Sequence, residues 1–392
     1  MTGRVRVAQV VTRFMAGAGG VALRGALALD SDCYEVVFVV GSGNRLIQEA
    51  QDAGFEVVIQ EHLRSEISLP HDRAALADLK AFCRTGRFDV VHTHSAKAGA
   101  LGRLAARDAQ VGRIVHTYHG FPFHDFQSRI RRQTYIRIER SLARFTDAFL
   151  AVGPAVAAEA IVRRIAPPER VRTIGVAVSN GRAPDLSDQA EARRLLGVPP
   201  GMRVVGTVGR LDFQKAPEDF VNALARLHRS DIYGVWIGDG PLRAKTEKLA
   251  ARRGLKGRMA FLGERSDVAN LLPGLDVFAM ASRYEGLPCA IVEAMAAARP
   301  VVATAVNAVP NVVITGETGL LVPPGRPDLL SRALAYLIDN PAVADRLART
   351  GRAHLGDEMC PAALGAVLDE TYRPEPNREH PTPRGELEVL AS

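Results

Sequence analysis

Cysteines and long apolar runs are scarce in this 392-residue chain. The four cysteines are scattered, with no metal-ligand spacing and no disulfide framework, which favours a reducing compartment. No stretch approaches the roughly 20 uninterrupted apolar residues of a membrane span, and no signal peptide opens the chain. These absences predict a cytoplasmic protein without a structural metal site.

The composition is that of a globular protein, but its charge is uneven. Hydrophobic residues make up 47% and charged residues 24%, and the length predicts two or three domains. Residues 1–180 hold 24 Lys and Arg against 17 Asp and Glu, which accounts for the whole net charge of +7. This excess predicts a phosphorylated substrate or an anionic membrane surface as partner. Nucleic acid is not expected, because no basic run is interleaved with aromatics as in known binding modules.

Short β-branched runs alternate with helical patterns along most of the chain. In the first half we expect strands at 5–11, 36–40, 56–59, 90–92, 113–117, 149–152 and 171–174, and helices such as 21–29, 73–83 and 129–145. In the second half we expect strands at 204–208, 234–237, 259–261, 277–280, 301–303 and 319–322. Near-continuous apolar strands separated by helices indicate parallel sheets covered on both faces. The pattern predicts an α/β fold of two doubly wound, Rossmann-like domains that face each other across a cleft.

The expected domain limits follow from composition. A stretch rich in Pro, Gly, Asp and Ser at 175–200 forms a neck between a first domain, 1–180, and a second domain, 181–359. The helical run 360–373 is expected to pack back on the first domain. Residues 374–392 turn to Pro, Glu and Arg and predict a disordered tail.

Two glutamates, Glu285 and Glu293, flank a turn and a helix start. Gly286 permits a tight turn, and Pro288 suits the first turn of a helix. Free N–H groups at a helix start attract a phosphate, whereas carboxylates accept hydrogen bonds from sugar hydroxyls. The combination indicates a sugar attached to a phosphate. The alternative is a solvated loop residue and a charge on a helix face.

Arg210 and Lys215 follow the expected strand 204–208, at the sheet edge where open α/β folds bind ligands. The planar fork of Arg and the mobile charge of Lys suit a pyrophosphate. Fixed cations there would stabilise the negative charge of a departing nucleoside diphosphate. The alternative is two solvated surface cations.

In the first half, Gly17–Gly20 forms a glycine-rich turn between the first strand and the following helix, close enough for backbone to approach a phosphate or a sugar. The turn lacks the full dinucleotide spacing, so a nicotinamide cofactor is not expected. His119 follows a strand end and is expected to point into the cleft. We interpret His92 and His94 as polar loop residues, with acceptor contact as the alternative.

The segment 121–140 mixes three phenylalanines with five arginines. A basic amphipathic helix beside the cleft predicts peripheral contact with anionic lipid at the inner membrane face. The alternative is an ordinary solvated face whose arginine stems cover apolar surface.

The chain resembles glycosyltransferase family 4, retaining enzymes of the GT-B fold that use nucleotide-sugar donors. The resemblance covers most of residues 4–373. It is carried by Gly-Arg-Leu-Asp-Phe-Gln-Lys at 209–215, by 285–293 with the following Ala-Met-Ala-Ala-Ala-Arg-Pro, and by Gly-Glu-Thr-Gly-Leu-Leu-Val-Pro-Pro at 316–324.

The resemblance implies a role for each matching position in the second half. Arg210 and Lys215 would grip the donor diphosphate, Glu293 would accept the ribose hydroxyls, and Glu285 would hold the transferred sugar. Backbone groups of Gly286 and Leu287 would lie near the sugar and the phosphate. No metal and no cofactor are expected, because the basic pair neutralises the charge.

The first half matches the family more loosely. His119 would reach the sugar from the opposite domain, and Gly19 and Gly20 would approach the diphosphate or the acceptor. Two departures bear on donor and acceptor preference. Relatives usually carry Gly-Gly near Asn307–Ala308 with a Glu at Asn311, and an acidic residue where this chain has Val21–Ala22.

The resemblance implies retaining transfer of a hexosyl unit from a UDP- or GDP-linked sugar to a hydroxyl on an unidentified acceptor. Three alternatives share the fold or the ligand. They are a sugar-nucleotide epimerase, a phosphorylase with a pyridoxal lysine, and a non-catalytic subunit that binds sugar nucleotides.

Overall fold

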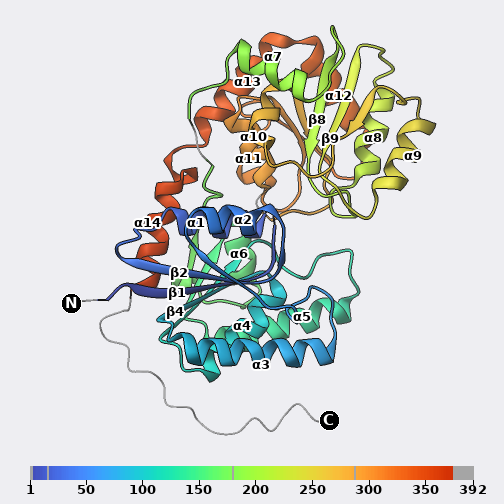
Figure 1. Ribbon diagram of the computed structural model, residues 1–392. Coiled ribbons are helices and arrows are strands. Elements are labelled where there is room, and N and C mark those ends of the chain that lie inside the picture. The colour runs from blue at the N-terminus through green and yellow to red at the C-terminus, as the bar shows by residue number, and fades with distance from the viewer. Residues whose placement is uncertain (1–2, 16, 179–180, 287, 374–392) are drawn as a thin grey trace.

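The computed structural model describes residues 3–15, 17–178, 181–286 and 288–373, which form two α/β domains (Figure 1). The first contains the parallel sheet β3-β2-β1-β4-β5-β6-β7. Its strands are β1 (Val5–Phe14), β2 (Tyr34–Gly43), β3 (Glu56–Ile59), β4 (Val90–His94), β5 (Arg113–Tyr118), β6 (Ala148–Ala151) and β7 (Val171–Thr173). Its helices are α1 (Ala18–Leu27), α2 (Arg45–Asp52), α3 (Leu69–Gly86), α4 (Ala96–Asp108), α5 (Arg129–Leu142) and α6 (Pro154–Val162).

The second domain is built around the parallel sheet β10-β9-β8-β11-β12-β13. Its strands are β8 (Arg203–Val208), β9 (Ile232–Ile237), β10 (Met259–Phe261), β11 (Val277–Met280), β12 (Val301–Thr304) and β13 (Leu320–Val322). The remaining helices are α7 (Leu186–Leu195), α8 (Pro217–Arg226), α9 (Arg243–Arg252), α10 (Val268–Leu271), α11 (Cys289–Ala296), α12 (Pro327–Asp339), α13 (Pro341–His354) and α14 (Pro361–Tyr372).

Both sheets are doubly wound, as the sequence predicts. Strand order reverses between β1 and β4 in the first sheet and between β8 and β11 in the second. Side chains of the central strand β1 alternate between two buried clusters: Val7 and Val11 join one, Ala8 and Val10 the other. Both faces of the sheet are therefore covered, and ligands are expected at the crevices where the order reverses.

The element boundaries differ from expectation at three places that matter for the site. Strand β1 continues to Phe14, and β4 continues to His94. Helix α1 begins at Ala18, so Gly19 and Gly20 lie in its first turn and not in the loop before it. The prediction of a glycine turn that ends at residue 20 is wrong. The first N–H groups of a helix have no intrahelical partner, as in a loop. The glycines therefore do not show where the loop ends and the helix begins.

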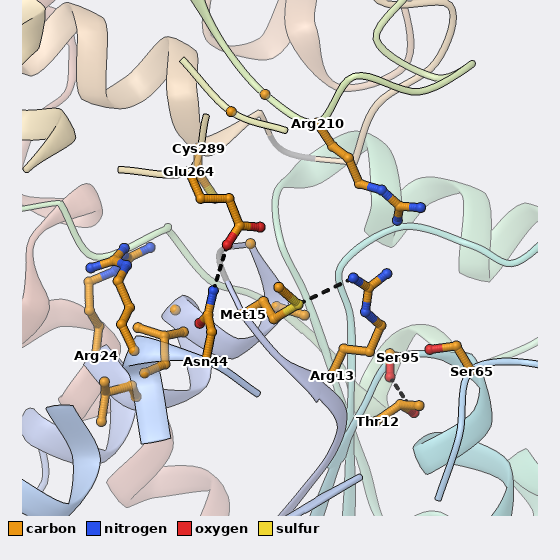
Figure 2. Close-up of a pocket in the computed structure, with 18 of the residues that line it drawn as sticks. Thr12, Arg13, Met15, Arg24, Asn44, Ser65, Ser95, Arg210, Glu264 and Cys289 are labelled. Carbon is orange, nitrogen blue, oxygen red and sulfur yellow. Dashed lines mark hydrogen bonds between the residues drawn. The ribbon is translucent and has the colours of Figure 1, made fainter. Parts of the chain in front are cut away.

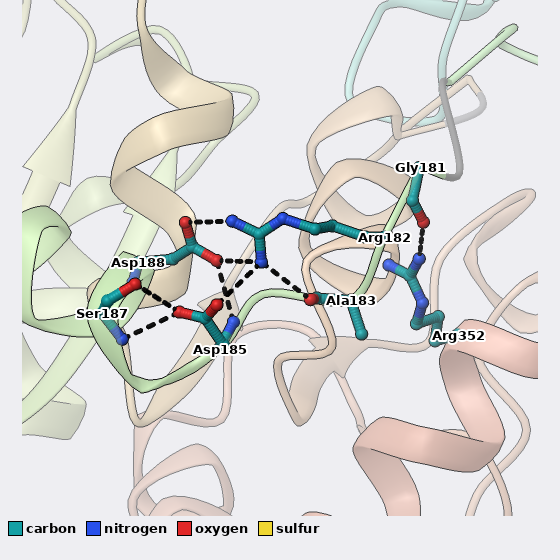
Figure 3. Close-up of polar contacts among 7 residues, drawn as sticks. All are labelled: Gly181, Arg182, Ala183, Asp185, Ser187, Asp188 and Arg352. Atoms are coloured by element: carbon teal, nitrogen blue, oxygen red, sulfur yellow. Dashed lines mark hydrogen bonds and ion pairs between the residues drawn. The ribbon is translucent and has the colours of Figure 1, made fainter.

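The neck is more ordered than its composition indicates, because it contains α7. Asp185 caps this helix by accepting hydrogen bonds from the Ser187 and Asp188 backbone N–H groups at 2.8 and 3.0 Å. Arg182 pairs with both aspartates, and Arg352 donates to the Gly181 carbonyl (Figure 3). The start of the second domain is therefore held by a capping box and by α13.

Helix α14 lies against the first domain, although the preceding helix α13 belongs to the second (Figure 1). It packs on α1, and two glycines permit the close contact. A Cβ atom at Gly365 would lie 2.5 Å from the Ala28 carbonyl oxygen, and one at Gly25 would lie 2.8 Å from Leu368. The chain thus enters the second domain after β7 and returns to the first at its last described helix. The expected tail, 374–392, lies outside the described residues.

A fully buried ion pair fixes α4 to α5. Arg103 is 0% exposed and donates to the Glu139 carboxylate at 2.8 Å, and the Tyr118 hydroxyl donates to the same oxygen at 2.9 Å. An unpaired charge at this position would face apolar neighbours.

We therefore expect Glu139→Ala to destabilise the first domain by about 3–5 kcal/mol and Tyr118→Phe by about 1 kcal/mol. Urea unfolding followed by circular dichroism measures both changes. The single tryptophan, Trp236, lies in β9 of the second sheet, so its fluorescence transition is the internal control. A Glu139→Ala midpoint equal to that of the wild type would contradict the assignment.

Among the described residues, no helix combines the length and apolarity that crossing a bilayer requires.

Candidate functional site

A cavity of about 1050 Å³ opens between the two domains, at the carboxyl ends of β1, β4 and β8 (Figure 2). Its first-domain wall includes Thr12, Arg13, Gly20, Arg24, Asn44, Ser95 and Lys97. Its second-domain wall includes Gly209, Arg210, Gly238, Glu264, Cys289 and Glu293. The cavity therefore lies where both strand orders reverse, which is the ligand position of doubly wound sheets.

The loop after β8 is held by backbone contacts. The Trp236 indole donates to the Gly209 carbonyl at 2.8 Å, and a Cβ atom at Gly238 would lie 2.2 Å from that same oxygen. This packing carries Arg210 into the cavity wall, with its side chain half exposed and its Nε 3.6 Å from the Asp212 carboxylate. Figure 2 shows the Arg210 guanidinium on the opposite side of the cavity from Arg24.

Lys215, at the end of that loop, forms an ion pair with Glu285. Its ammonium lies 2.5 Å from a Glu285 carboxylate oxygen, and both side chains are largely buried, at 18% and 5% exposed. The Ser282 hydroxyl donates to that oxygen at 2.6 Å, and Gln214 donates to the other at 3.2 Å. Glu285 is therefore not a solvated loop residue. Its carboxylate pairs with one of the two cations that are expected to bind the diphosphate.

Glu293 lies on α11 and lines the cavity, and no described residue donates a hydrogen bond to its carboxylate. Burial raises the pKa of Glu293, whereas the charges of Arg24 and Arg45 across the cavity act to lower it. A half-buried acceptor without a partner is free to bind hydroxyl groups of a ligand.

His119 and Gly286 meet where the two domains touch. A Cβ atom at Gly286 would lie 1.8 Å from the His119 carbonyl oxygen, so only glycine permits this approach. The His119 ring is half-buried, and its Nε2 lies 2.9 Å from Nδ1 of His94. Burial, with a smaller contribution from Arg24, lowers the pKa of His119 to about 3, so the ring is neutral at physiological pH.

The interpretation of His92 and His94 as polar loop residues is wrong. Both lie on β4 and are buried, at 1% and 2% exposed. Both are hydrogen-bonded inside the first domain. Alternation along a strand places both rings on one face of the sheet, where polar partners from distant parts of the chain satisfy them.

The predicted site residues thus fall into one cluster, but not all of them line the cavity. Gly20, Arg210 and Glu293 line the cavity. Five other predicted residues do not line it: Gly19, His119, Lys215, Glu285 and Gly286. Gly19 lies behind the wall, since a Cβ atom there would be 3.1 Å from the Phe14 backbone. Leu287 lies outside the described residues.

The asparagines of the first departure, Asn307 and Asn311, make specific contacts. Asn307 has the left-handed φ of 42°, which asparagine tolerates better than most side chains, and its amide oxygen accepts a hydrogen bond from the Glu285 N–H at 2.9 Å. The Asn311 amide oxygen accepts one at 3.2 Å from the Ala155 N–H, in the other domain. Asn307 thus supports the Glu285 loop, and Asn311 joins the domains.

Further contacts close the cleft beside the cavity. The rings of His124 and Tyr284 stack across the domains with centroids 4.4 Å apart, and Phe126 meets Phe213 edge-on at 5.6 Å. At the cavity itself, the Asn44 amide donates to the Glu264 carboxylate at 2.9 Å (Figure 2). The domains are therefore in contact on more than one side of the cavity.

Sequence reasoning missed several cavity residues of the first domain. Arg24 is one helical turn after Gly20, so helical spacing from the glycine run was a usable signal. Arg13 lies at the carboxyl end of β1 and Lys97 follows β4, which also marks them as ligand-facing in a doubly wound sheet. No local signal marks the pairing of Asn44 with Glu264, because the two residues lie in different domains.

Comparison with known proteins gives consistent matches. Residues 188–354 match the family "Glycosyl transferases group 1", and residues 15–180 match "Glycosyltransferase Family 4". The chain is 30% identical over 280 residues to the UDP-Gal:alpha-D-GlcNAc-diphosphoundecaprenol alpha-1,3-galactosyltransferase of Escherichia coli, covering 70% of this chain and 72% of the relative. It is also 30% identical over 315 residues to a D-inositol 3-phosphate glycosyltransferase of Saccharomonospora viridis, covering 74% and 71%.

Among solved structures, Anabaena HepE in complex with UDP and glucose superposes with a TM-score of 0.80 at 21% identity, covering 94% of this chain and 99% of HepE.

Proposed function

Because the chain belongs to glycosyltransferase family 4, a retaining family that transfers sugars from nucleotide donors, we propose that it moves a hexosyl unit from a UDP-linked sugar to a hydroxyl of a lipid-diphosphate-linked saccharide. The observation that carries the proposal is the cavity at the carboxyl edges of both sheets, with Arg210 on one wall and Arg13 and Arg24 on the other. It offers cations to two phosphorylated substrates.

The donor half of the proposal rests on the second domain and on the relatives. The Escherichia coli relative is named for a UDP-galactose donor, and HepE was solved with UDP and glucose. Glu293 would accept the ribose hydroxyls, and Arg210 and Lys215 would bind the diphosphate. Glu285 would then exchange its contact with Lys215 for hydroxyls of the transferred sugar, with backbone groups of Gly286 and Leu287 beside it.

The chemistry follows from where charge develops. As the bond between the anomeric carbon and the diphosphate oxygen breaks, negative charge accumulates on the diphosphate, and two fixed cations stabilise it. The acceptor hydroxyl attacks from the face that the diphosphate leaves, with a phosphate oxygen taking its proton, which retains the anomeric configuration. No metal takes part in this scheme. Contact between the domains excludes water and limits hydrolysis of the donor.

The acceptor half rests on the first domain. A cavity of about 1050 Å³ is at the upper limit for a single ligand, so it has room for two substrates. Exposed apolar side chains surround its first-domain side, including Ile67 at 78% and Ile138 at 43% exposed, both of which line the cavity. This apolar rim favours a lipid-linked acceptor over the free inositol phosphate for which the other relative is named.

Exposed apolar residues at the start of α5 support peripheral contact with an anionic membrane. Ile130, at the start of α5, is 82% exposed, and Phe126 just before α5 is 57% exposed. The helix itself carries five arginines, so basic and apolar groups lie together beside the cavity. Membrane contact at this face would bring the acceptor's lipid to the cavity without a membrane-spanning segment.

Asn307 is expected to tune the affinity for the donor. Replacing it with glycine keeps the left-handed backbone but removes the hydrogen bond to the Glu285 N–H. Loss of one such bond, about 1 kcal/mol, should raise the KM for the donor about fivefold with kcat nearly unchanged. Steady-state kinetics with varied donor measure this. A fall in kcat at constant KM would contradict a role in ground-state binding.

The reaction itself is tested by mass spectrometry of products. The protein is incubated with UDP-glucose, UDP-galactose, UDP-N-acetylglucosamine or GDP-mannose, each with a polyprenyl-diphosphate saccharide, with inositol phosphate, or with no acceptor. We expect transfer from a UDP sugar to the lipid-linked saccharide, undiminished by EDTA. Isomerised donor without acceptor would indicate an epimerase. Binding without turnover would indicate a non-catalytic subunit, and either result would overturn the proposal.

A further inference from the structure

A continuous buried hydrogen-bond network connects His119 at the domain contact to the end of α14. His119 Nε2 meets His94 Nδ1 at 2.9 Å, and His94 Nε2 meets the Gln9 amide oxygen at 2.6 Å. The Gln9 amide nitrogen donates to the Tyr372 hydroxyl at 2.8 Å. The network thus joins the loop after β5, strands β4 and β1, and helix α14.

The network continues beyond Tyr372 and ends inside the domain. The Tyr372 hydroxyl meets His92 Nδ1 at 2.6 Å, and His92 Nε2 meets the Thr117 hydroxyl at 2.6 Å. Gln9, His92, His94, Thr117 and Tyr372 are each at most 2% exposed. Water therefore does not compete for these groups, and the direction of every hydrogen bond is coupled to that of its neighbours.

The proton positions follow in sequence from the Gln9 amide. Its NH₂ group donates to Tyr372, so the single phenol proton goes to His92 Nδ1. Its oxygen accepts from His94, so the proton of the neutral His94 ring is on Nε2, and its Nδ1 is an acceptor. Only the Nε2–H of His119 can satisfy that acceptor.

The remaining nitrogen of His119 is therefore a free acceptor. Nδ1 of His119 has no hydrogen-bond partner among the described residues. The atom is not fully buried, so it is exposed to solvent. Burial lowers the pKa values of His92 and His119 to about 3 and that of His94 well below its usual range, so all three rings stay neutral. A reversed Gln9 amide would reverse each proton and turn this acceptor into a donor.

We infer that Gln9, His94 and Tyr372 are positioning residues that hold His119 with its proton on Nε2, so that Nδ1 accepts a hydrogen bond from a hydroxyl of the transferred sugar. The sugar contact rests on the proposed transferase reaction. The tautomer of His119 does not, because it is a property of the protein without substrate.

The test compares Tyr372→Phe with Tyr34→Phe. Tyr34 also anchors α14, through a 2.8 Å hydrogen bond to Asp369, and its ring contacts Tyr372, but it lies outside the network. Nitrogen-15 NMR of the ligand-free full chain reports which nitrogen of His119 carries the proton. We expect Nε2–H in the wild type and in Tyr34→Phe, and a mixture of tautomers in Tyr372→Phe.

Kinetics give the second readout. Tyr372→Phe should lower kcat about fivefold, the loss of one hydrogen bond to substrate, while the KM for the donor changes little. In a His119→Ala background, Tyr372→Phe should cause no further fall in kcat, because Tyr372 acts through His119. If Tyr372→Phe does not fold, Gln9→Met removes both the acceptor of His94 and the donor to Tyr372 while the sequence of α14 stays unchanged, and it carries the same expectations.

An unchanged His119 tautomer in the variant would overturn the inference, as would an equal loss of kcat with and without His119. Absence of any transferase activity would instead refute the proposed reaction and leave the NMR result to decide the positioning role.

Discussion

Replacing Lys215 with alanine is expected to lower kcat by about 10²–10³-fold at saturating donor, because a fixed charge is removed from the departing diphosphate. The variant has a second defect. Glu285 keeps its negative charge in a largely buried position but loses the ammonium at 2.5 Å, so it repels the diphosphate. Donor affinity, measured by calorimetry, should therefore fall as well.

Two comparisons separate these effects. Lys215→Ala combined with Glu285→Gln should recover donor affinity but not kcat, since only the repulsion is relieved. Lys245→Ala, an exposed lysine on α9, is the matched control and should leave both quantities unchanged. Near-normal kcat in both Lys215→Ala and Arg210→Ala would show that these side chains do not stabilise the leaving group.

The second large effect is expected at Gly286. Alanine there would place a Cβ atom 1.8 Å from the His119 carbonyl oxygen, whereas real Cβ atoms essentially never come within 3.0 Å, so the domains must separate by about 1 Å. A displacement of that size at a reacting centre costs about 10²-fold in rate. Initial rates at saturating substrates measure the loss.

The folded state of each domain should tolerate this change, because the clash is between domains. Thermal melting of Gly286→Ala should therefore remain close to that of the wild type. Gly181→Ala is the control, since a Cβ atom at Gly181 meets nothing within 4 Å. Wild-type rates in Gly286→Ala would mean that the contact between Gly286 and His119 is not needed for catalysis.

Features that depend on neighbouring residues could be predicted from the sequence. The strands were visible as apolar runs, and both sheets have the predicted doubly wound form. Pro217 is the first residue of α8, a position that proline favours and that the sequence alone can indicate. The loop with Arg210 and Lys215 follows a strand, so its position at the carboxyl edge of the second sheet could also be predicted.

Features that depend on distant residues could not be predicted in this way. His92 looks like any polar residue at a strand end, and its partner Tyr372 is 280 residues away. The pairing of Lys215 with Glu285 joins positions 70 residues apart. In each case a polar group is satisfied by a partner that only the tertiary fold supplies, and no local periodicity records it.

The return of α14 to the first sheet has a consequence for biosynthesis. On the ribosome, β1 to β7 emerge early, but Tyr372 is made only after the entire second domain. Until then Gln9 and His92 lack the hydroxyl that joins them, and the face of α1 around Gly25 lacks the helix that packs on it. A chain that ends before α14 therefore has both sheets but lacks the Tyr372 hydroxyl, so sugar transfer is expected only in molecules whose synthesis has passed α14.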